Sequence, residues 1–281
     1  MKTVKLTLLC CLLTALTFAD VSQKQREALV TIYNSTNGDA WTNSWDLDQP
    51  ISSWYGLTIE NDNVVALNLA FNNLKGELPK EISNLTALRV LNLSFNKLEG
   101  DLPKSLMEMT HLEHLILFSN QFVGAIPSNI GSLKNLIALE LYNNSFFGEI
   151  PKSIGNLSKL ETLNLSSNLL MGKLPNSIEN LKVLKVLSVF DNNLLGTIPS
   201  AIGKLQHLEE LVLSNNAFYG NLPNELAQLG NLKTLLLSNN DFKGNYAMLK
   251  GQLPNIVDFD LDEVNMKGAL ATLDAEDDDD D

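Results

Sequence analysis

Apolar residues recur along this chain with a period of 24 residues, and the pattern continues without a gap from Val64. In each period positions 1, 4 and 6 are apolar, position 9 is Asn in all repeats but the last, position 11 is Leu or Phe in most, and position 13 is Gly. The first positions are Val64, Leu88, Leu112, Leu136, Leu160, Leu184, Leu208, Leu232 and Ile256. A sequence repeat with a period between 20 and 30 residues predicts a solenoid of stacked coils, because one coil cannot bury its apolar side without neighbours.

The spacing inside one repeat predicts a short strand, a tight corner and a returning arm. Positions 4 and 6 are two residues apart, so their side chains fall on one face of a strand. Strands of successive coils are expected to pair in parallel, about 4.8 Å apart. Gly at position 13 permits backbone conformations closed to other residues, and Pro at position 16 in the first seven repeats excludes a long regular helix.

The asparagines at position 9 predict a structural ladder rather than a ligand site. A buried corner leaves backbone N–H and C=O groups without partners, and an Asn side chain supplies both a donor and an acceptor. The ladder residues are Asn72, Asn96, Asn120, Asn144, Asn168, Asn192, Asn216 and Asn240.

A segment before the repeats, residues 20–63, has the features of an N-terminal cap. Ser22 followed by a Gln three residues later resembles a capping box, and Gly38 is the expected end of the helix. All three tryptophans of the chain lie in this segment, at Trp41, Trp45 and Trp54. We expect them to form the core of the cap, with a sugar-binding aromatic platform as the alternative.

The stretch LIALELYNNSFFGEIPKSIGNLSK (136–159) is a nearly complete copy of the pattern LxxLxLxxNxLxGxIPxxIGxLxx. It resembles the plant-type subclass of extracellular leucine-rich repeats, strongly over 64–245 and weakly over 246–270. The resemblance implies an α/β repeat solenoid, a right-handed curved superhelix with a parallel sheet on its concave side and a helical cap at its N-terminus. The solenoid would extend over residues 64–270 and consist of nine repeats, of which the last two are degenerate. Plant members usually carry a cysteine pair in the cap, which 20–63 lacks, so this cap is more like those of microbial surface or secreted members.

The two ends of the chain predict export and a solvated tail. Residues 1–19 have basic residues, then an apolar run, then Ala19, as a secretory signal peptide does. Cys10 and Cys11, both inside this segment, are the only cysteines, so the mature chain would contain no disulfide. Residues 271–281 are expected to be an acidic, disordered tail. The formal charge of −13 argues against a nucleic-acid partner, and membrane contact is expected only during export.

The last repeat departs from the pattern, and its strand is acidic. Asp258, Asp260, Asp262 and Glu263 would point away from the core and protect the open edge of the sheet from unwanted pairing. A weak calcium site built from the same carboxylates is the alternative, although their alternating spacing lacks the loop of a dedicated site.

Residue types that carry catalysis are scarce. His111, His114 and His207 do not have the spacing of zinc ligands, and the glycine-rich phosphate loop signature is absent. Glu209 and Glu210 are adjacent, so their side chains diverge on a strand. We therefore expect no enzyme activity, no metal and no cofactor.

Exposed positions around the strand predict a binding surface on the concave face. Aromatic residues replace the usual small polar residue at positions 7 and 8 of several coils, and apolar or acidic residues occur at positions 3 and 5. Phe118 and Tyr142 are expected about 5 Å apart on neighbouring strands. Exposed aromatic patches mark interfaces, although some of these rings could merely pack over the corner. The candidate ligand-binding residues are Phe71, Phe95, His114, Ile116, Phe118, Glu140, Tyr142, Phe190 and Glu210. An acidic rim including Glu161, Asp191 and Glu209 is expected beside them.

The resulting hypothesis is a monomeric, secreted or cell-surface recognition protein that binds a protein or peptide on its concave face. The alternatives are a carbohydrate or cell-wall adhesion module, a secreted inhibitor of a polysaccharide-degrading enzyme, and a structural spacer without a ligand. Six N-x-S/T sequons occur, but glycans at Asn92, Asn143 and Asn164 would block the proposed face, so we expect an unglycosylated protein.

Overall fold

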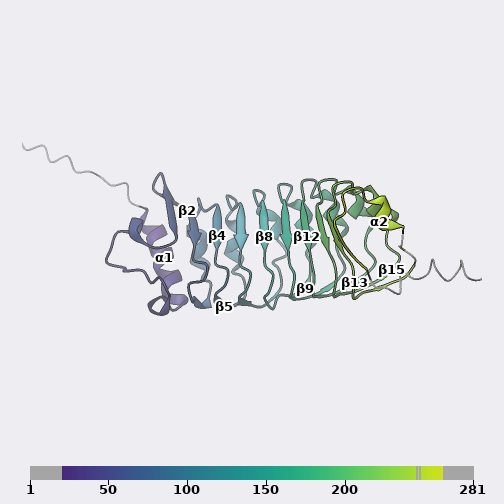
Figure 1. Cartoon of the computed structure of the whole chain (residues 1–281). Coiled ribbons are helices and arrows are strands. Elements are labelled where there is room, and N and C mark those ends of the chain that lie inside the picture. The colour runs from purple at the N-terminus through teal and green to yellow at the C-terminus, as the bar shows by residue number, and fades with distance from the viewer. Residues whose placement is uncertain (1–20, 245, 247, 262–281) are drawn as a thin grey trace, which may run out of the picture.

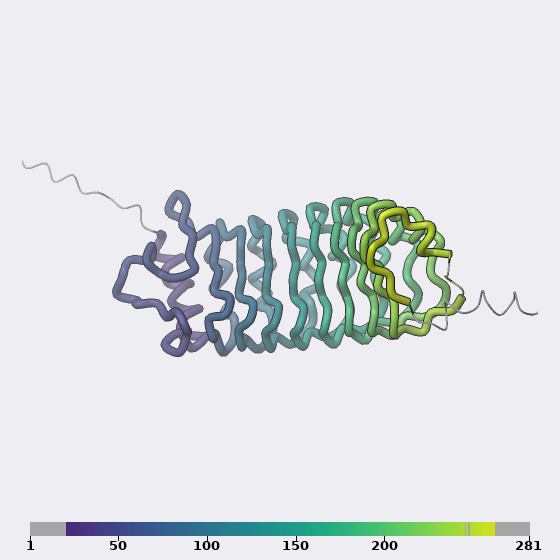
Figure 2. Tube along the Cα trace, viewed as in Figure 1, coloured from purple at the N-terminus to yellow at the C-terminus, as the bar shows by residue number. Residues whose placement is uncertain are grey.

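A computed structural model describes residues 21–244, 246 and 248–261 of the chain. They form an elongated stack of coils that runs from the N-terminal cap to the last strand (Figures 1 and 2). Coils are numbered here by repeat, so coil 1 begins at Val64. The predicted signal peptide at 1–19, the end of the last repeat at 262–270 and the acidic tail at 271–281 lie outside the described residues.

A large sheet runs the length of the stack, as predicted. In the described part of the chain it has ten strands, in which β2 to β18 pair in parallel and β1 pairs antiparallel with β2. Its register places equivalent residues of successive coils side by side, so Leu91 pairs with Leu115. The strands are β1 (Leu57–Glu60), β2 (Asn63–Asn68), β4 (Val90–Asn92), β6 (His114–Ile116), β8 (Ala138–Glu140), β10 (Thr162–Asn164), β12 (Val186–Ser188), β14 (Glu210–Val212), β16 (Thr234–Leu236) and β18 (Asp258–Asp260).

The core is one continuous column of apolar side chains inside the coils. Residues at positions 1, 4 and 6, such as Leu88, Leu91 and Leu93, are fully buried, and the same positions are buried through coil 8. Burial of each such leucine contributes about 1.5–3 kcal/mol to the free energy of folding. The period of the pattern therefore predicts the core correctly.

A second layer of short strands follows the corner of each coil and was not predicted. These strands begin near position 10 and pair in parallel in two groups, with an isolated bridge between Ala125 and Phe147 linking them. Gly100 and Gly124 at position 13 have φ values of 76° and 82°, which glycine adopts without strain. The strands are β3 (Lys75–Glu77), β5 (Lys97–Gly100), β7 (Gln121–Phe122), β9 (Phe147–Glu149), β11 (Leu169–Gly172), β13 (Asn193–Gly196), β15 (Ala217–Gly220) and β17 (Asp241–Phe242).

The returning arms form short 3₁₀ helices, which confirms that Pro at position 16 excludes a long regular helix. In most coils that Pro is the residue directly before the helix, where its missing N–H leaves no bond unmade. The helices are η3 (Lys80–Asn84), η4 (Lys104–Glu108), η5 (Ile130–Ser132), η6 (Lys152–Asn156), η7 (Asn176–Asn180), η8 (Ser200–Lys204) and η9 (Asn224–Gln228). Coil 8, whose pattern is degenerate, has the helical turn α2 (Leu249–Gln252) instead.

The cap consists of α1 (Gln23–Ser35) and the short helices η1 (Gly38–Ala40) and η2 (Ile51–Ser53). Ser22 caps α1 and accepts a hydrogen bond from the backbone N–H of Gln25, as expected. The predicted end at Gly38 is wrong, because the helix ends at Ser35 and Asn37, not Gly38, takes the left-handed conformation at φ 59°. Gly38 instead lies against the ring of Tyr33, where a Cβ would lie 2.3 Å from ring carbons.

The three tryptophans form the core of the cap, which confirms the structural prediction. Trp41, Trp45 and Trp54 are each about 5% exposed or less, and the rings of Trp45 and Trp54 stack at 4.8 Å. Each indole N–H donates to a backbone carbonyl, so these buried polar groups are satisfied. Within the described residues, no helix combines the length and the apolar character needed to cross a membrane.

The last strand carries exposed acidic side chains. Asp258 and Asp260 are exposed on β18, as the edge-protection hypothesis expects, while Asp262 and Glu263 lie outside the described residues. Among the side chains that the structure describes, no group of three or more His, Cys, Asp and Glu could hold a metal ion.

Candidate recognition surface

The corner at positions 7 to 9 is held in one conformation by the asparagine ladder. The amide of Asn96 donates to the carbonyls of Leu69, Leu93 and Ser94 at 2.8–3.1 Å, and its oxygen accepts from the N–H of Leu74 at 3.0 Å. Asn120, Asn144, Asn168, Asn192, Asn216 and Asn240 repeat the bonds to the three carbonyls. The ladder is therefore structural, as predicted.

Position 8, next to the ladder, adopts the left-handed backbone conformation in every one of the first eight coils. Its φ lies between 49° and 56° at Phe71, Phe95, Ser119, Asn143, Ser167, Asp191, Asn215 and Asn239. Asn and Asp suit this conformation, but a bulky residue there is uncommon and costs about 1–2 kcal/mol. The two phenylalanines in coils 1 and 2 are thus held where the backbone disfavours them.

Four aromatic rings from coils 1 to 4 form a continuous group, the aromatic patch, made of Phe71, Phe95, Phe118 and Tyr142. The rings of Phe71 and Phe95 stack at 4.0 Å, those of Phe95 and Phe118 meet edge to face at 5.0 Å, and those of Phe118 and Tyr142 stack at 4.2 Å. Phe71 is 66% exposed and Phe95 is 43% exposed. The predicted proximity of Phe118 and Tyr142 is confirmed, and the patch extends further towards the cap than the rings at position 7 indicate.

Phe190 does not join this patch. It lies two coils beyond Tyr142, with Ser166 at the equivalent position of the coil between them. Among the described residues, no ring contact links it to another aromatic side chain. Glu210, exposed on β14, lies three strands from β8 and is level with Ala138, so it is about 16 Å from Glu140. These two candidate residues therefore lie apart from the patch.

Glu140 lies beside the patch with a partly desolvated carboxyl. It is half-buried on β8, between Ile116 of β6 and Asn164 of β10. Burial raises the pKa of Glu140, while the charge of His114 acts in the opposite direction. The pKa of Tyr142 is also raised, first by burial and then by the charge of Glu140. Ile116, His114 and Glu140 thus lie close together next to the patch.

The predicted acidic rim is partly neutralised. Glu161 pairs with Lys185 at 2.7 Å and Glu209 pairs with Lys233 at 2.5 Å, each across one coil. The hydrogen bond and charge of Lys233 lower the pKa of Glu209. The sequence analysis did not predict these ion pairs, although their opposite charges lie one period apart, at position 2 of neighbouring repeats. Each of these two carboxylates has its own lysine, so the rim carries less net negative charge there than the sequence indicates.

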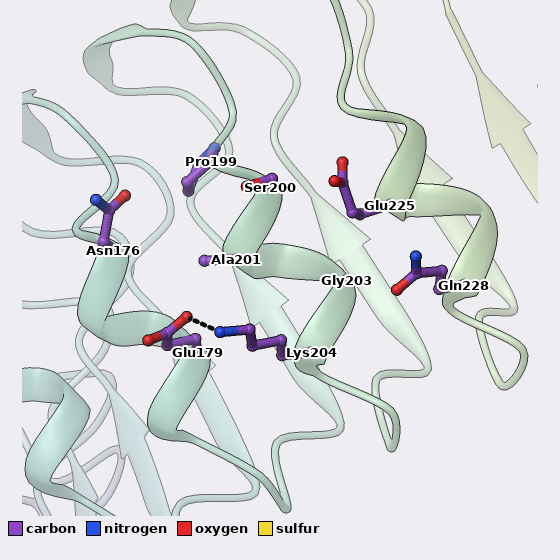
Figure 3. Close-up of a pocket in the computed structure, with 9 residues that line it drawn as sticks. All are labelled: Asn176, Glu179, Pro199, Ser200, Ala201, Gly203, Lys204, Glu225 and Gln228. Atoms are coloured by element: carbon purple, nitrogen blue, oxygen red, sulfur yellow. Dashed lines mark hydrogen bonds and ion pairs between the residues drawn. The ribbon is translucent and has the colours of Figure 1, made fainter.

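A hollow on the surface lies elsewhere, between the 3₁₀ helices η7, η8 and η9 (Figure 3). It has a volume of about 440 Å³ and holds none of the candidate residues. Glu179 and Lys204 pair at 2.7 Å along it, and this hydrogen bond lowers the pKa of Glu179. Its lining mixes exposed residues with the buried Ala201 and Gly203, and the Glu179 carboxylate is already paired. We therefore regard the hollow as the ordinary gap between neighbouring coils.

Comparison with known proteins agrees with this architecture. Family models described as "Leucine rich repeat" and "Leucine-rich repeat region" match residues 62–122 and 128–249. A probable leucine-rich repeat receptor-like protein kinase of Arabidopsis thaliana is 45% identical over 53 residues, which are 18% of this chain and 6% of that protein.

Solved structures of plant receptors are similar over most of the chain. The ectodomain of GASSHO1/SCHENGEN3 from Arabidopsis thaliana, in complex with Casparian strip integrity factor 2, is 32% identical with a TM-score of 0.66, covering 84% of this chain and 32% of that one. The ectodomain of the Arabidopsis receptor kinase HAESA, in complex with an IDA peptide hormone ligand, is 27% identical with a TM-score of 0.67, covering 83% and 44%. This chain spans less than half the length of each of these relatives. Its repeats, its stacked parallel sheet and these matches make the chain a leucine-rich-repeat protein.

Proposed function

We propose that this protein is a secreted or cell-surface, non-catalytic recognition protein that binds a protein or peptide at the aromatic patch. The observation that carries this proposal is the pair Phe71 and Phe95, two exposed rings kept in a left-handed conformation that Asn or Asp would adopt more easily. Strain that persists at an exposed site favours a functional role for the side chain. Aromatic side chains are also enriched in the cores of interfaces.

The relatives support a peptide or protein as the partner. Two of the similar ectodomains were solved with bound ligands, one of them a peptide hormone. Because this chain spans under half of those receptors, the carry-over of ligand binding is our proposal. The likeness of the cysteine-free cap to those of microbial surface or secreted members stays a prediction from sequence.

The chemistry around the patch indicates what the partner presents. Apolar side chains of the partner would contact the rings and Ile116, and a cationic or hydrogen-bond-donating group would face Glu140. A half-buried carboxyl with a raised pKa gains more from such a group than an exposed one, since less water competes for it. A preformed, rigid surface loses little entropy on binding, which suits a solenoid.

Carbohydrate adhesion remains the alternative, but the ring geometry favours it less. A sugar stacks on a free aromatic face, whereas each stacked pair in the patch covers one face of both of its rings. Retention on glycan particles that free sugar competes away would support adhesion instead. Inhibition of a polysaccharide-degrading enzyme would be one form of the protein recognition proposed here.

Affinity capture from the extracellular fraction of the source organism tests the proposal. The double variant Phe118→Ala/Tyr142→Ala removes half of the patch, and Phe190→Ala, outside the patch, is the matched control. We expect the wild type and the control to retain the same protein or peptide and the double variant to lose it. Equal retention by all three, with folding verified by circular dichroism, would contradict the proposal.

A further inference from the structure

The second layer of strands exposes a line of apolar side chains that the aromatic patch does not use. Position 12 is apolar in five consecutive coils, and each of these side chains is between 40% and 50% exposed. They form the apolar row, which consists of Val123, Phe147, Met171, Leu195 and Tyr219. Position 12 of the flanking coils is charged, with Lys75 and Glu99 at one end and Lys243 at the other. Strands β9, β13 and β15 follow the lower edge of the stack in Figure 1.

The register of these strands makes the row continuous. Phe147 pairs with Leu169 of the next coil and Leu195 pairs with Ala217, so each strand is offset by two residues from its neighbour. With strands about 4.8 Å apart and two residues spanning about 6.6 Å, neighbours in the row lie about 8 Å apart, within reach of long side chains. Leu169, 52% exposed, fills one of the gaps.

Strand propensity does not account for this composition. Val, Phe and Tyr are common in strands, but Leu and Met gain no comparable preference, and the charged residues at both ends show that the position accepts polar side chains. Contiguous exposed apolar surface of this kind marks an interaction site.

The charges at the two ends indicate which partner the row fits. Glu99 precedes Met171 by 72 residues (171 − 99) and Lys243 follows it by 72 (243 − 171), so they lie three coils to either side. Within the described residues, neither side chain has an ion-pair partner. A second copy turned antiparallel about Met171 would place its Lys243 opposite Glu99, and its Glu99 opposite Lys243.

We propose that the apolar row is the contact surface between two copies of this chain, packed face to face and antiparallel with Met171 at the two-fold axis. In this arrangement Phe147 faces Leu195 of the second copy, and Val123 faces Tyr219. The opposite alignment would place Glu99 on Glu99 and Lys243 on Lys243, which repel. A self-complementary pattern is what a two-fold interface requires, whereas an unrelated partner gives no reason for the charges to be equidistant from one residue.

The dimer differs from the monomer expected from the sequence, and it leaves the aromatic patch on another surface of the coils. This inference therefore does not rest on the proposed function. The row and Leu169 would supply the apolar centre of the interface, with the polar side chains of Asn193, Glu149 and Lys173 beside it as part of its rim.

Sedimentation velocity of the purified chain over a range of concentrations tests the interface. We expect a concentration-dependent dimer for the wild type and a monomer for Met171→Glu, which places two carboxylates at the axis. Asn224→Glu adds the same charge at an exposed site on η9 and is expected to dimerise like the wild type. A wild type that stays monomeric throughout, or a Met171→Glu variant that still dimerises, would overturn the proposal.

A charge exchange tests the antiparallel register independently of the apolar contact. Glu99→Lys places two lysines opposite each other at both ends, and Lys243→Glu places two glutamates there, so each is expected to weaken dimerisation several-fold. The combined variant Glu99→Lys/Lys243→Glu restores opposite charges and is expected to return close to the wild type. Failure of the combined variant to recover would overturn the proposed arrangement of the two copies.

Discussion

Coils 1 to 4 and coils 5 to 8 have the same backbone at the corner beside the large sheet but present different surfaces. At position 8, φ is 54° at Phe71 and 53° at Phe95, and it is 55° at Asn215 and 56° at Asn239. The first half adds stacked rings at this corner, whereas the second half has mostly short polar side chains and lysine–glutamate pairs. The repeat thus determines the backbone conformation of the coils, and the residues outside the repeat pattern determine what each half can bind.

Replacing a ladder asparagine should have the largest effect and the same effect in both halves. Asn120→Ala and Asn216→Ala each remove bonds to three carbonyls and one backbone N–H. Because those groups stay buried without partners, we expect the free energy of unfolding to fall by about 2–4 kcal/mol in each. Urea unfolding followed by circular dichroism measures this. A clear difference in unfolding free energy between the two variants would show that the asparagine ladder does not stabilise the two halves equally.

Exchanging residues at position 8 should separate the halves. Asn215→Phe places a bulky residue in the left-handed conformation without a ring to stack on, so we expect unfolding free energy to fall by about 1–2 kcal/mol. Phe71→Asn relieves that cost but loses one ring contact worth about 0.5–1.5 kcal/mol, so its net effect should be within about 0.5 kcal/mol. Thermal unfolding of both variants checks the pair. If Asn215→Phe were neutral, the left-handed position would impose no cost and the strain argument for Phe71 and Phe95 would fail.

The carboxyl of Glu140 should give the smallest effect, with a defined dependence on pH. Its pKa is raised in the folded state, so ionisation destabilises the fold as pH rises above the unfolded value, and the penalty is complete above the folded pKa. Glu140→Gln should therefore stabilise the protein near neutral pH by less than about 1 kcal/mol, since water reaches this half-exposed group, and the gain should vanish in acid. Melting temperatures across pH measure it, and Glu210→Gln is the exposed control. A gain that grew in acid would contradict this assignment.

The residues of the repeat pattern could be predicted from sequence because each has one physical role. Leu91 must be buried, Asn120 must satisfy a corner and Gly100 must take a positive φ, so their spacing alone indicates the coil. The second layer of strands was missed for two reasons. Its paired residues are 22 positions apart in the sequence, whereas the repeat has a period of 24, and the alternation of apolar and polar residues at positions 10 to 12 is weak.

The candidate site was predicted only in part, for a different reason. The proximity of Phe118, Tyr142 and Glu140 follows from the register of the strands. The stacking of Phe71 on Phe95 depends on a left-handed backbone, which a phenylalanine in the sequence does not indicate. Phe190 was grouped with the other rings by its repeat position, although a coil with a serine separates it from Tyr142. Position in the repeat gives the direction of a side chain, whereas a patch also requires neighbours on adjacent coils.

The most direct test of the central claim is calorimetric titration of the captured partner into the wild type and three single variants. The account predicts that Phe95→Ala and Tyr142→Ala each weaken binding by about tenfold or more, as truncation of interface anchors does, while Phe190→Ala changes it less than about twofold. Equal losses in all three variants, or a loss confined to Phe190→Ala, would contradict recognition through the aromatic patch.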